Sequence, residues 1–279
     1  MSFTVNLDLG SFEPQVAAVA GLAQLLVDHS PRFVFVSSVA RGAASSREGK
    51  IPADRSLPLS DALGGYGRSK AVAEEILLNS SLPATVVRVG QLSGSSKTGR
   101  WEASNWVPAI LQSSSKLGCL PDLDGKTAWT PIDIAGLILR DITFDSTRPV
   151  MHLENPNMTP WSDIFAEAAR ALAPPHSKPI KIVPYAEWYE ALGAYKAAAS
   201  SEEEAAKELP ALRLFSFFAS LLPNSNEKKH GERDASGART LETSESAAEC
   251  KRLANCHRID GGDVRAWIAY WRSIGYLSS

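Results

Sequence analysis

Two kinds of hydrophobic pattern alternate along the first 90 residues. From 13 to 28 the apolar side chains recur at helical spacing, which predicts an amphipathic helix. Residues 32–38 form a nearly continuous apolar run, which is typical of a strand covered on both faces of a parallel sheet. A helix over 66–79 and a strand over 82–89 follow. This β-α-β order predicts two parallel strands joined by a right-handed crossover.

Beyond residue 100 the pattern is mostly helical. Helices are predicted over 105–114, 132–142, 161–172, 185–192, 193–224 and 263–274, and short strands over 149–153 and 180–183. Thr159 is the predicted N-cap of helix 161–172, with Pro160 at its first position. Ser200 and Ser201 precede three glutamates, which fits a cap followed by an acidic first turn. The polar stretch 224–249 is predicted to be a mobile loop.

These elements predict an α/β fold with a partial Rossmann-like parallel sheet and a mostly helical C-terminal part. We expect residues 1–146 to form the sheet core that carries the active site. Residues 147–279 would form a mainly helical C-terminal subdomain. The 279 residues include 22% charged and 44% apolar side chains, within the ordinary globular range.

Charge and cysteine content narrow the expected partners. The net charge of -2 gives no basic footprint, so neither nucleic acid nor an anionic membrane is expected as a partner. No signal sequence opens the chain, and no apolar run approaches the roughly 18 residues of a membrane helix. We therefore expect a cytoplasmic protein. Its three cysteines are too few and too unevenly placed for a disulfide framework, and free thiols are expected in preference to a metal site.

The candidate chemistry lies in a tyrosine and a lysine, Tyr66 and Lys70, which are four residues apart and so share one helical face. An ammonium near a phenol is expected to lower the pKa of the phenol from about 10. Ser38 ends the buried strand, where its hydroxyl can polarise a carbonyl. Such a set can move a proton to or from a carbonyl oxygen. The alternative is a chance pair of solvated helix neighbours, but the preceding strand, the polar loop over 41–63 and the Gly-Gly helix start favour catalysis.

This order of parts resembles the short-chain dehydrogenase/reductase superfamily, extended type. The resemblance implies that Ser38, Tyr66 and Lys70 are the catalytic set, with Tyr66 as acid/base and Lys70 also bonding the nicotinamide ribose. A second stretch, Arg88-Val89-Gly90-Gln91-Leu92-Ser93-Gly94, resembles thioester reductase domains of nonribosomal peptide synthetases, polyketide synthases and carboxylate reductases. The stretch 129–135 resembles another landmark of the extended type, and Phe12-Glu13-Pro14 resembles the fourth helix of such proteins. The tryptophan-rich segment 266–277 is similar to the closing helix of the fungal thioester reductases.

The resemblance implies an NADPH-dependent release of a carrier-bound acyl thioester as an aldehyde. Tyr66, Lys70, Val89 and Gln91 would contact the cofactor. The partner would be an acyl or peptidyl carrier protein whose phosphopantetheine arm bears the substrate. The resemblance implies that the helical part, residues 147–279, is the substrate subdomain on which this carrier docks. Trp101 and Trp106 would line an acyl channel, with ordinary core packing as the alternative.

One family feature is not found in the sequence. No G-x-G-x-x-G opens the chain after a strand, so roughly a hundred residues, the first βαβ half of a dinucleotide fold, are expected to be missing. Three hypotheses follow. The chain is a reductase, alone or with another chain that supplies the nucleotide-binding half. It is a truncated, inactive remnant that acts at most as a binding module. Or it is another extended-type enzyme, such as a sugar-nucleotide epimerase, which the 88–94 stretch and the tryptophan-rich end disfavour.

Overall fold

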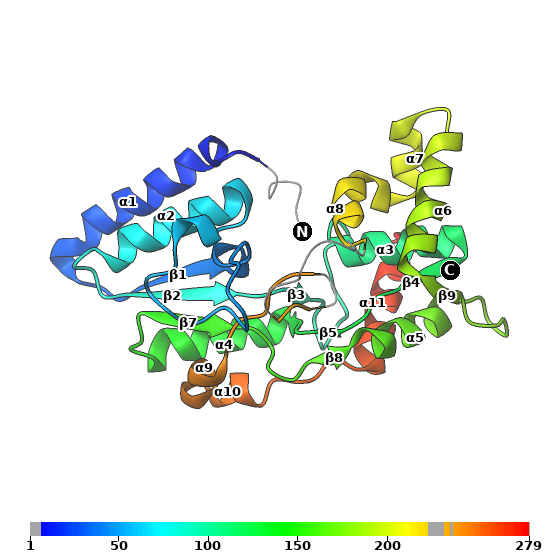
Figure 1. The fold of residues 1–279 in the computed structure, drawn as a ribbon. Coiled ribbons are helices and arrows are strands. Elements are labelled where there is room, and N and C mark those ends of the chain that lie inside the picture. Colours follow the sequence, from blue (N-terminus) through cyan, green and yellow to red (C-terminus); the bar gives the residue numbers. More distant parts are fainter. Residues whose placement is uncertain (1–6, 223–231, 235–236, 279) are drawn as a thin grey trace.

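A three-stranded parallel sheet forms one side of the molecule (Figure 1). The computed structural model describes residues 7–222, 232–234 and 237–278. Strands β1 (Phe33–Ser38), β2 (Ala84–Val89) and β7 (Val150–Leu153) lie in the order β1-β2-β7. The helix α2 (Gly64–Leu78) connects β1 to β2, and both strand pairs are parallel. The predicted β-α-β unit and its parallel pairing are confirmed.

Helices cover both faces of this sheet. On one face, α1 (Glu13–Leu26) and α2 pack on β1 through a cluster that includes Ala23, Leu77 and Phe35. On the other face lie α4 (Ile132–Asp145), α9 (Ser244–Glu249) and α10 (Lys251–Ala254), as Figure 1 shows. Their apolar side chains bury Val87 and Met151 of the sheet. Coverage on both faces explains why the strands read as continuous apolar runs.

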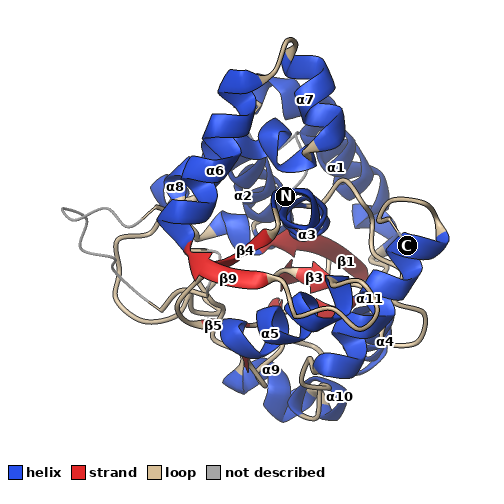
Figure 2. Cartoon of the chain, turned by 90° about the vertical axis from the view of Figure 1, so that its right-hand side faces the viewer, coloured by secondary structure: helices blue, strands red, loops and turns tan. Residues whose placement is uncertain are grey.

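A helical lobe forms the other side (Figures 1 and 2). It contains α3 (Trp106–Leu117), α5 (Trp161–Leu172), α6 (Tyr185–Ala198), α7 (Glu202–Glu208), a 3-10 turn (Pro210–Leu214), α8 (Phe215–Ser220) and α11 (Gly261–Ser273). Short strand pairs accompany it: β4 (Cys119–Asp122) with β9 (Lys181–Pro184), β3 (Leu92–Ser93) with β6 (Thr130–Pro131), and β5 (Lys126–Thr127) with β8 (Thr159–Pro160). All seven tryptophans are buried in its core. The α/β fold class is confirmed.

The predicted division at residue 146 stays a prediction. The sheet takes β7 from beyond that point, and the helical lobe takes α3 from before it. Within the described residues, no helix is both long enough and apolar enough to cross a bilayer.

Two predicted details differ at helix starts. Thr159 is not the cap of α5, because it pairs in β8 and its hydroxyl donates to the Ile259 carbonyl; Pro160 takes the cap position with no side-chain bond. The last helix begins at Gly261, two residues earlier than predicted, since Asp260 caps it through bonds from the Gly262 and Asp263 amides. The predicted cap at Ser201 is confirmed by its bond from the Glu204 amide.

The predicted mobile loop over 224–249 is wrong for its second part. Its residues 224–231 and 235–236 lie outside the described ones. The segment 239–246, which we call the strap, is fixed by long-range contacts. Leu241 forms a parallel bridge with Ile51, and buried Arg239 donates to the carbonyls of Ser45 and Gly49. Helix α9 then begins at Ser244. A polar composition concealed these contacts because the partners lie almost 200 residues away in sequence.

Candidate active site

The structure brings Ser38 and Tyr66 together at the carboxyl end of the sheet. Ser38 ends β1 and is in register with Val89, which ends β2. Tyr66 lies in the first turn of α2, and the Ser38 hydroxyl is near enough to its phenol to affect the pKa of Tyr66. The carboxyl ends of parallel strands are where α/β folds bind ligands. The predicted serine–tyrosine pair therefore occupies a position suited to catalysis.

A glycine explains how α2 comes so close to β1. A Cβ on Gly67 would meet the Ala40 carbonyl oxygen at 2.5 Å, far inside contact distance. Ala40 follows Ser38 by two residues, and its amide bonds back to the Ser38 Oγ at 3.2 Å. Only glycine allows the first turn of α2 to rest on this backbone. The contact sets Tyr66 beside Ser38.

Phe12 is a neighbour of Tyr66 that sequence reasoning missed. The two rings meet edge to face with centroids 5.9 Å apart, and Phe12 is buried. The Phe12-Glu13-Pro14 stretch was a signal of family resemblance only; its packing partner lies 54 positions away and could not be read from it. Gln15, three residues after Phe12, is exposed.

Lys70 lies near Tyr66 but donates a hydrogen bond to the backbone of β1. Its Nζ is 5.7 Å from the Tyr66 ring centroid and 4.8 Å from that of Phe35, and it donates to the Val36 carbonyl at 3.0 Å. Burial lowers the pKa of Lys70, and the Glu74 carboxylate one helical turn further on opposes that change. The cation thus faces the ring of Tyr66 from the β1 side.

The predicted lowering of the Tyr66 pKa is wrong for this structure. Burial raises the pKa of Tyr66, and the hydrogen bond from Ser38 only partly offsets this effect. Removing water penalises the phenolate more than the neighbouring groups stabilise it. Tyr66 is consequently protonated at neutral pH, which is the form that can donate a proton.

The two further candidates, Val89 and Gln91, lie at and just beyond the end of β2. Val89 is partly exposed at the carboxyl end of the central strand. The Gln91 amide is already engaged: its Nε2 donates to the Leu92 carbonyl at 2.6 Å, and its Oε1 accepts from Trp106 Nε1 at 3.3 Å. Gln91 thereby ties the turn after β2 to α3. Cofactor contact by these residues stays a prediction.

Beneath the site lies a buried ionic network that sequence reasoning did not find. Glu74 of α2 accepts from Ser37 and from both Nε and Nη2 of Arg88, the latter at 2.8 Å. Arg41 Nε lies 3.5 Å from the same carboxylate. The two arginines also donate to carbonyls of the 41–63 loop, at Pro52, Asp54, Leu57 and Pro58. The network locks that loop and α2 to the sheet.

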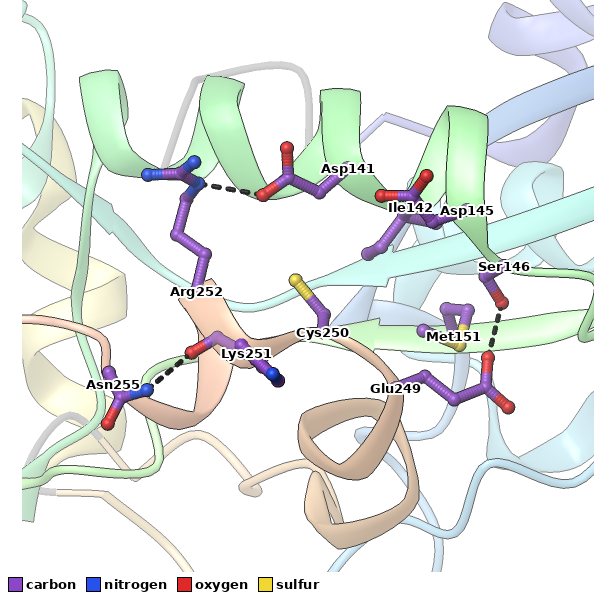
Figure 3. A pocket seen from close by; sticks show the side chains of 10 residues that line it. All are labelled: Asp141, Ile142, Asp145, Ser146, Met151, Glu249, Cys250, Lys251, Arg252 and Asn255. Atoms are coloured by element: carbon purple, nitrogen blue, oxygen red, sulfur yellow. Dashed lines mark hydrogen bonds and ion pairs between the residues drawn. The ribbon is translucent and has the colours of Figure 1, made fainter.

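Other candidate groups lie apart from this centre. A pocket of about 530 Å³ opens between the C-terminal end of α4 and helices α9 and α10, at the opposite end of the sheet (Figure 3).

Trp101 and Trp106 are buried among aromatic rings, and the ring centroids of Trp101 and Trp267 are 4.9 Å apart. Both side chains therefore contribute to the core. The three cysteines are free thiols. His257 with Asp260 and Asp263 could group around a cation, but the two carboxylates form the capping box of α11.

Comparison with known proteins agrees with this geometry. Residues 12–137 match the family model described as "Male sterility protein", an NAD-binding domain. The adenylate-forming reductase Nps10 of Heterobasidion annosum is 30% identical over 98% of the chain and 25% of the relative. The adenylate-forming reductase Nps11 of Serpula lacrymans is 31% identical to the chain, over 97% of the chain and 26% of Nps11. The structure of a thiolation-reductase di-domain from an archaeal non-ribosomal peptide synthetase superposes with a TM-score of 0.68 at 17% identity, covering 94% of this chain and 52% of that one.

Residues 12–137 thus match an NAD-binding family model, and a parallel sheet covered by helices on both faces agrees with that match. Over nearly its whole length the chain is similar to part of the adenylate-forming reductases Nps10 and Nps11. The chain spans about a quarter of the length of these two relatives.

Proposed function

We propose that this chain is an NADPH-dependent reductase that releases a carrier-bound acyl thioester as an aldehyde. The observation that carries the proposal is the placement of Ser38, at the carboxyl end of parallel strand β1, next to Tyr66, with the Lys70 ammonium beside the Tyr66 ring. The adenylate-forming reductases it resembles support the reaction class.

The residues of the chain have distinct roles in this mechanism. NADPH, when held by Tyr66 and Lys70, would supply the hydride for the thioester carbon. Ser38 and Tyr66 donate hydrogen bonds to the carbonyl oxygen, and Tyr66 passes its proton to that oxygen as negative charge develops. Lys70 stabilises the phenolate that is left. The resulting hemithioacetal breaks its C–S bond, giving an aldehyde and the free thiol of the carrier arm. A protonated Tyr66 is the form that this direction requires.

The described residues fit the catalytic side of a nicotinamide site. Tyr66 and Lys70 would hold the ribose, and the backbone of Val89 and Gln91 would flank the ring. Within the described ranges, no strand leads through a Gly-rich turn into a helix that could bind the pyrophosphate. We infer that a further segment or a second chain supplies that half.

The open edge of β1 is where this half would join. In the described part of the chain β1 is an edge strand, and Phe33 donates to the Pro83 carbonyl beside β2. Backbone groups of alternate residues face opposite sides, so those of Val36 face the open edge. Val36 is 45% exposed, and Leu22 and Leu25 of α1 are 46% and 69% exposed. A strand added here would extend the parallel sheet and cover apolar side chains.

We propose that the carrier protein docks on the helical lobe and presents its arm toward Ser38. The relative solved together with its thiolation domain supports a carrier as partner. We expect the reaction in the cytoplasm, where NADPH is regenerated. Carriers loaded with different acyl groups would identify the substrate.

Tyr66→Phe tests the chemistry. We expect NADPH-dependent reduction of an acyl thioester to fall by at least about a hundredfold, since general acid catalysis contributes 10²–10⁴-fold. The assay is NADPH consumption with aldehyde detection, with Tyr270→Phe in the helical lobe as the matched control. Unchanged activity in Tyr66→Phe would remove this residue from the mechanism. If the wild-type chain neither binds NADPH nor reduces a thioester, even with a nucleotide-binding half added, the inactive-remnant hypothesis takes its place.

Val36→Pro tests strand addition. Proline lacks the amide that would face an incoming strand, so co-expressed βαβ halves should no longer co-purify, while folding is retained. Phe35→Pro is the matched control: its amide faces β2, so that variant should lose folding stability. Undiminished co-purification with Val36→Pro would exclude β1 as the joining edge.

A further inference from the structure

The side chain of Glu154 is a buried carboxyl group that lies against the turn that follows β2. It comes immediately after β7 and is 6% exposed. The neighbouring backbones are joined by the bond from the Gly90 amide to the Leu153 carbonyl at 3.0 Å. A Cβ built on Gly90 would lie 2.3 Å from Glu154 Oε1. The carboxyl group therefore touches the backbone at Gly90, and a larger residue at that position would collide with it.

The other side of the carboxyl group holds the strap. The Leu241 amide donates to Glu154 Oε2 at 2.6 Å. Leu241 is flanked by two bonds that join the strap to the 41–63 loop, Ile51 N to Thr240 O at 2.9 Å and Glu242 N to Ile51 O at 2.8 Å. One carboxyl group thus spans the turn at 89–91 and the strap.

We propose that Glu154 is a positioning residue for the cofactor: its carboxyl group, fixed by the strap, sets how deep the 89–91 turn lies against the nicotinamide ring. This inference rests on the proposed function, because it assigns that turn to the cofactor. It concerns a residue that contacts neither substrate nor the reacting atoms. Its effect passes through Gly90.

The role requires an uncharged carboxyl group. Burial raises the pKa of Glu154 to about 8, the Asp234 charge acts in the same direction, and the Leu241 amide and Lys50 oppose them. The nearby β7 residue His152 is neutral at these pH values, since burial lowers its pKa to about 4. Above pH 8 a buried negative charge would appear between turn and strap. Water would be drawn in, and the turn would move from its place.

Glu154→Gln keeps the shape of the side chain and an oxygen that can accept from the Leu241 amide, but the glutamine side chain does not titrate. We expect NADPH affinity of the wild-type protein, together with any added nucleotide-binding half, to fall as pH rises from 7 to 9.5, by up to tenfold per pH unit above 8. The glutamine variant should show a flat profile. The readout is the emission of bound NADPH. Parallel profiles in the two proteins would overturn the proposal.

A second readout separates this proposal from the proposed function. Amide hydrogen exchange at Gly90 and Leu241, corrected for the intrinsic rate, should accelerate above pH 8 in the wild type and not in Glu154→Gln. This holds even if no NADPH binds, in which case the proposed function fails alone. Equal exchange in both proteins would contradict a coupling of turn and strap. If Glu154→Gln does not fold, Gly90→Ala replaces it: we expect at least tenfold faster exchange at Leu241, and unchanged exchange there would overturn the proposal.

Discussion

The sheet half and the helical lobe are held together by different physical means. Around α2 and the sheet, the buried Glu74 carboxylate accepts hydrogen bonds from Arg88 and forms an ion pair with Arg41, and both buried arginines also fix a long loop. In the lobe, buried tryptophans pack ring against ring, as in the stack of Trp161 on Phe165 at 3.9 Å. Burial of large aromatic rings contributes strongly to stability through apolar area. A buried ion pair, by contrast, stabilises the fold only if its geometry is good. The half that holds the proposed site is built from directional contacts.

Trp161→Ala should produce the largest effect. Removing a fully buried indole that stacks on Phe165 and Trp106 should cost about 3–5 kcal/mol of unfolding free energy. Denaturant unfolding would measure it. Phe144→Ala, which changes a side chain that is 76% exposed, is the control and should stay within about 0.5 kcal/mol. A small loss in Trp161→Ala would mean that the aromatic core can collapse around the gap.

Glu74→Gln tests the other half. It removes the carboxylate that pairs with buried Arg88 and leaves Arg41 only the half-exposed Glu75. We expect a loss of about 3 kcal/mol, the lower end for breaking a buried pair because the amide still accepts hydrogen bonds. Unlike Trp161→Ala, it should also reduce activity, since α2 and the 41–63 loop position Tyr66. Glu75→Gln, on the same helix but about half exposed, is the matched control. Loss of stability with full activity would separate the network from the site.

Asp260→Ala should have the smallest effect. Asp260 accepts bonds from the Gly262 and Asp263 amides at the exposed start of α11, and losing such a cap costs about 1 kcal/mol. The measurement is again denaturant unfolding, with Asp260→Asn expected to restore most of the stability. A loss near that of Glu74→Gln would show that exposed polar groups matter as much as buried ones here.

Local patterns predicted most of the fold. The helical spacing of apolar residues placed α1, α2, α4 and α5 within a few residues, and the apolar runs placed β1 and β2. The pairing of Ser38 with Tyr66 could be predicted because strand end and helix start are joined by one loop. These features depend on neighbours in sequence.

What could not be predicted depends on distant partners. Nothing near Leu241 indicates that it pairs with Ile51, and nothing near Lys70 indicates that its ammonium bonds to Val36. The balance between burial and nearby charges decided the pKa of Tyr66, and burial is a property of the whole fold. Long-range geometry therefore set the parts of the site that sequence reasoning missed or misjudged.

The distribution of aromatic residues gives the two halves different optical signals. Every tryptophan lies in the helical lobe, and of the six tyrosines Tyr66 alone belongs to the sheet half. Indole fluorescence therefore monitors the lobe and is nearly blind to the sheet. Melting followed at the indole emission and by far-ultraviolet circular dichroism can consequently be resolved into separate transitions, without attaching any label to the protein.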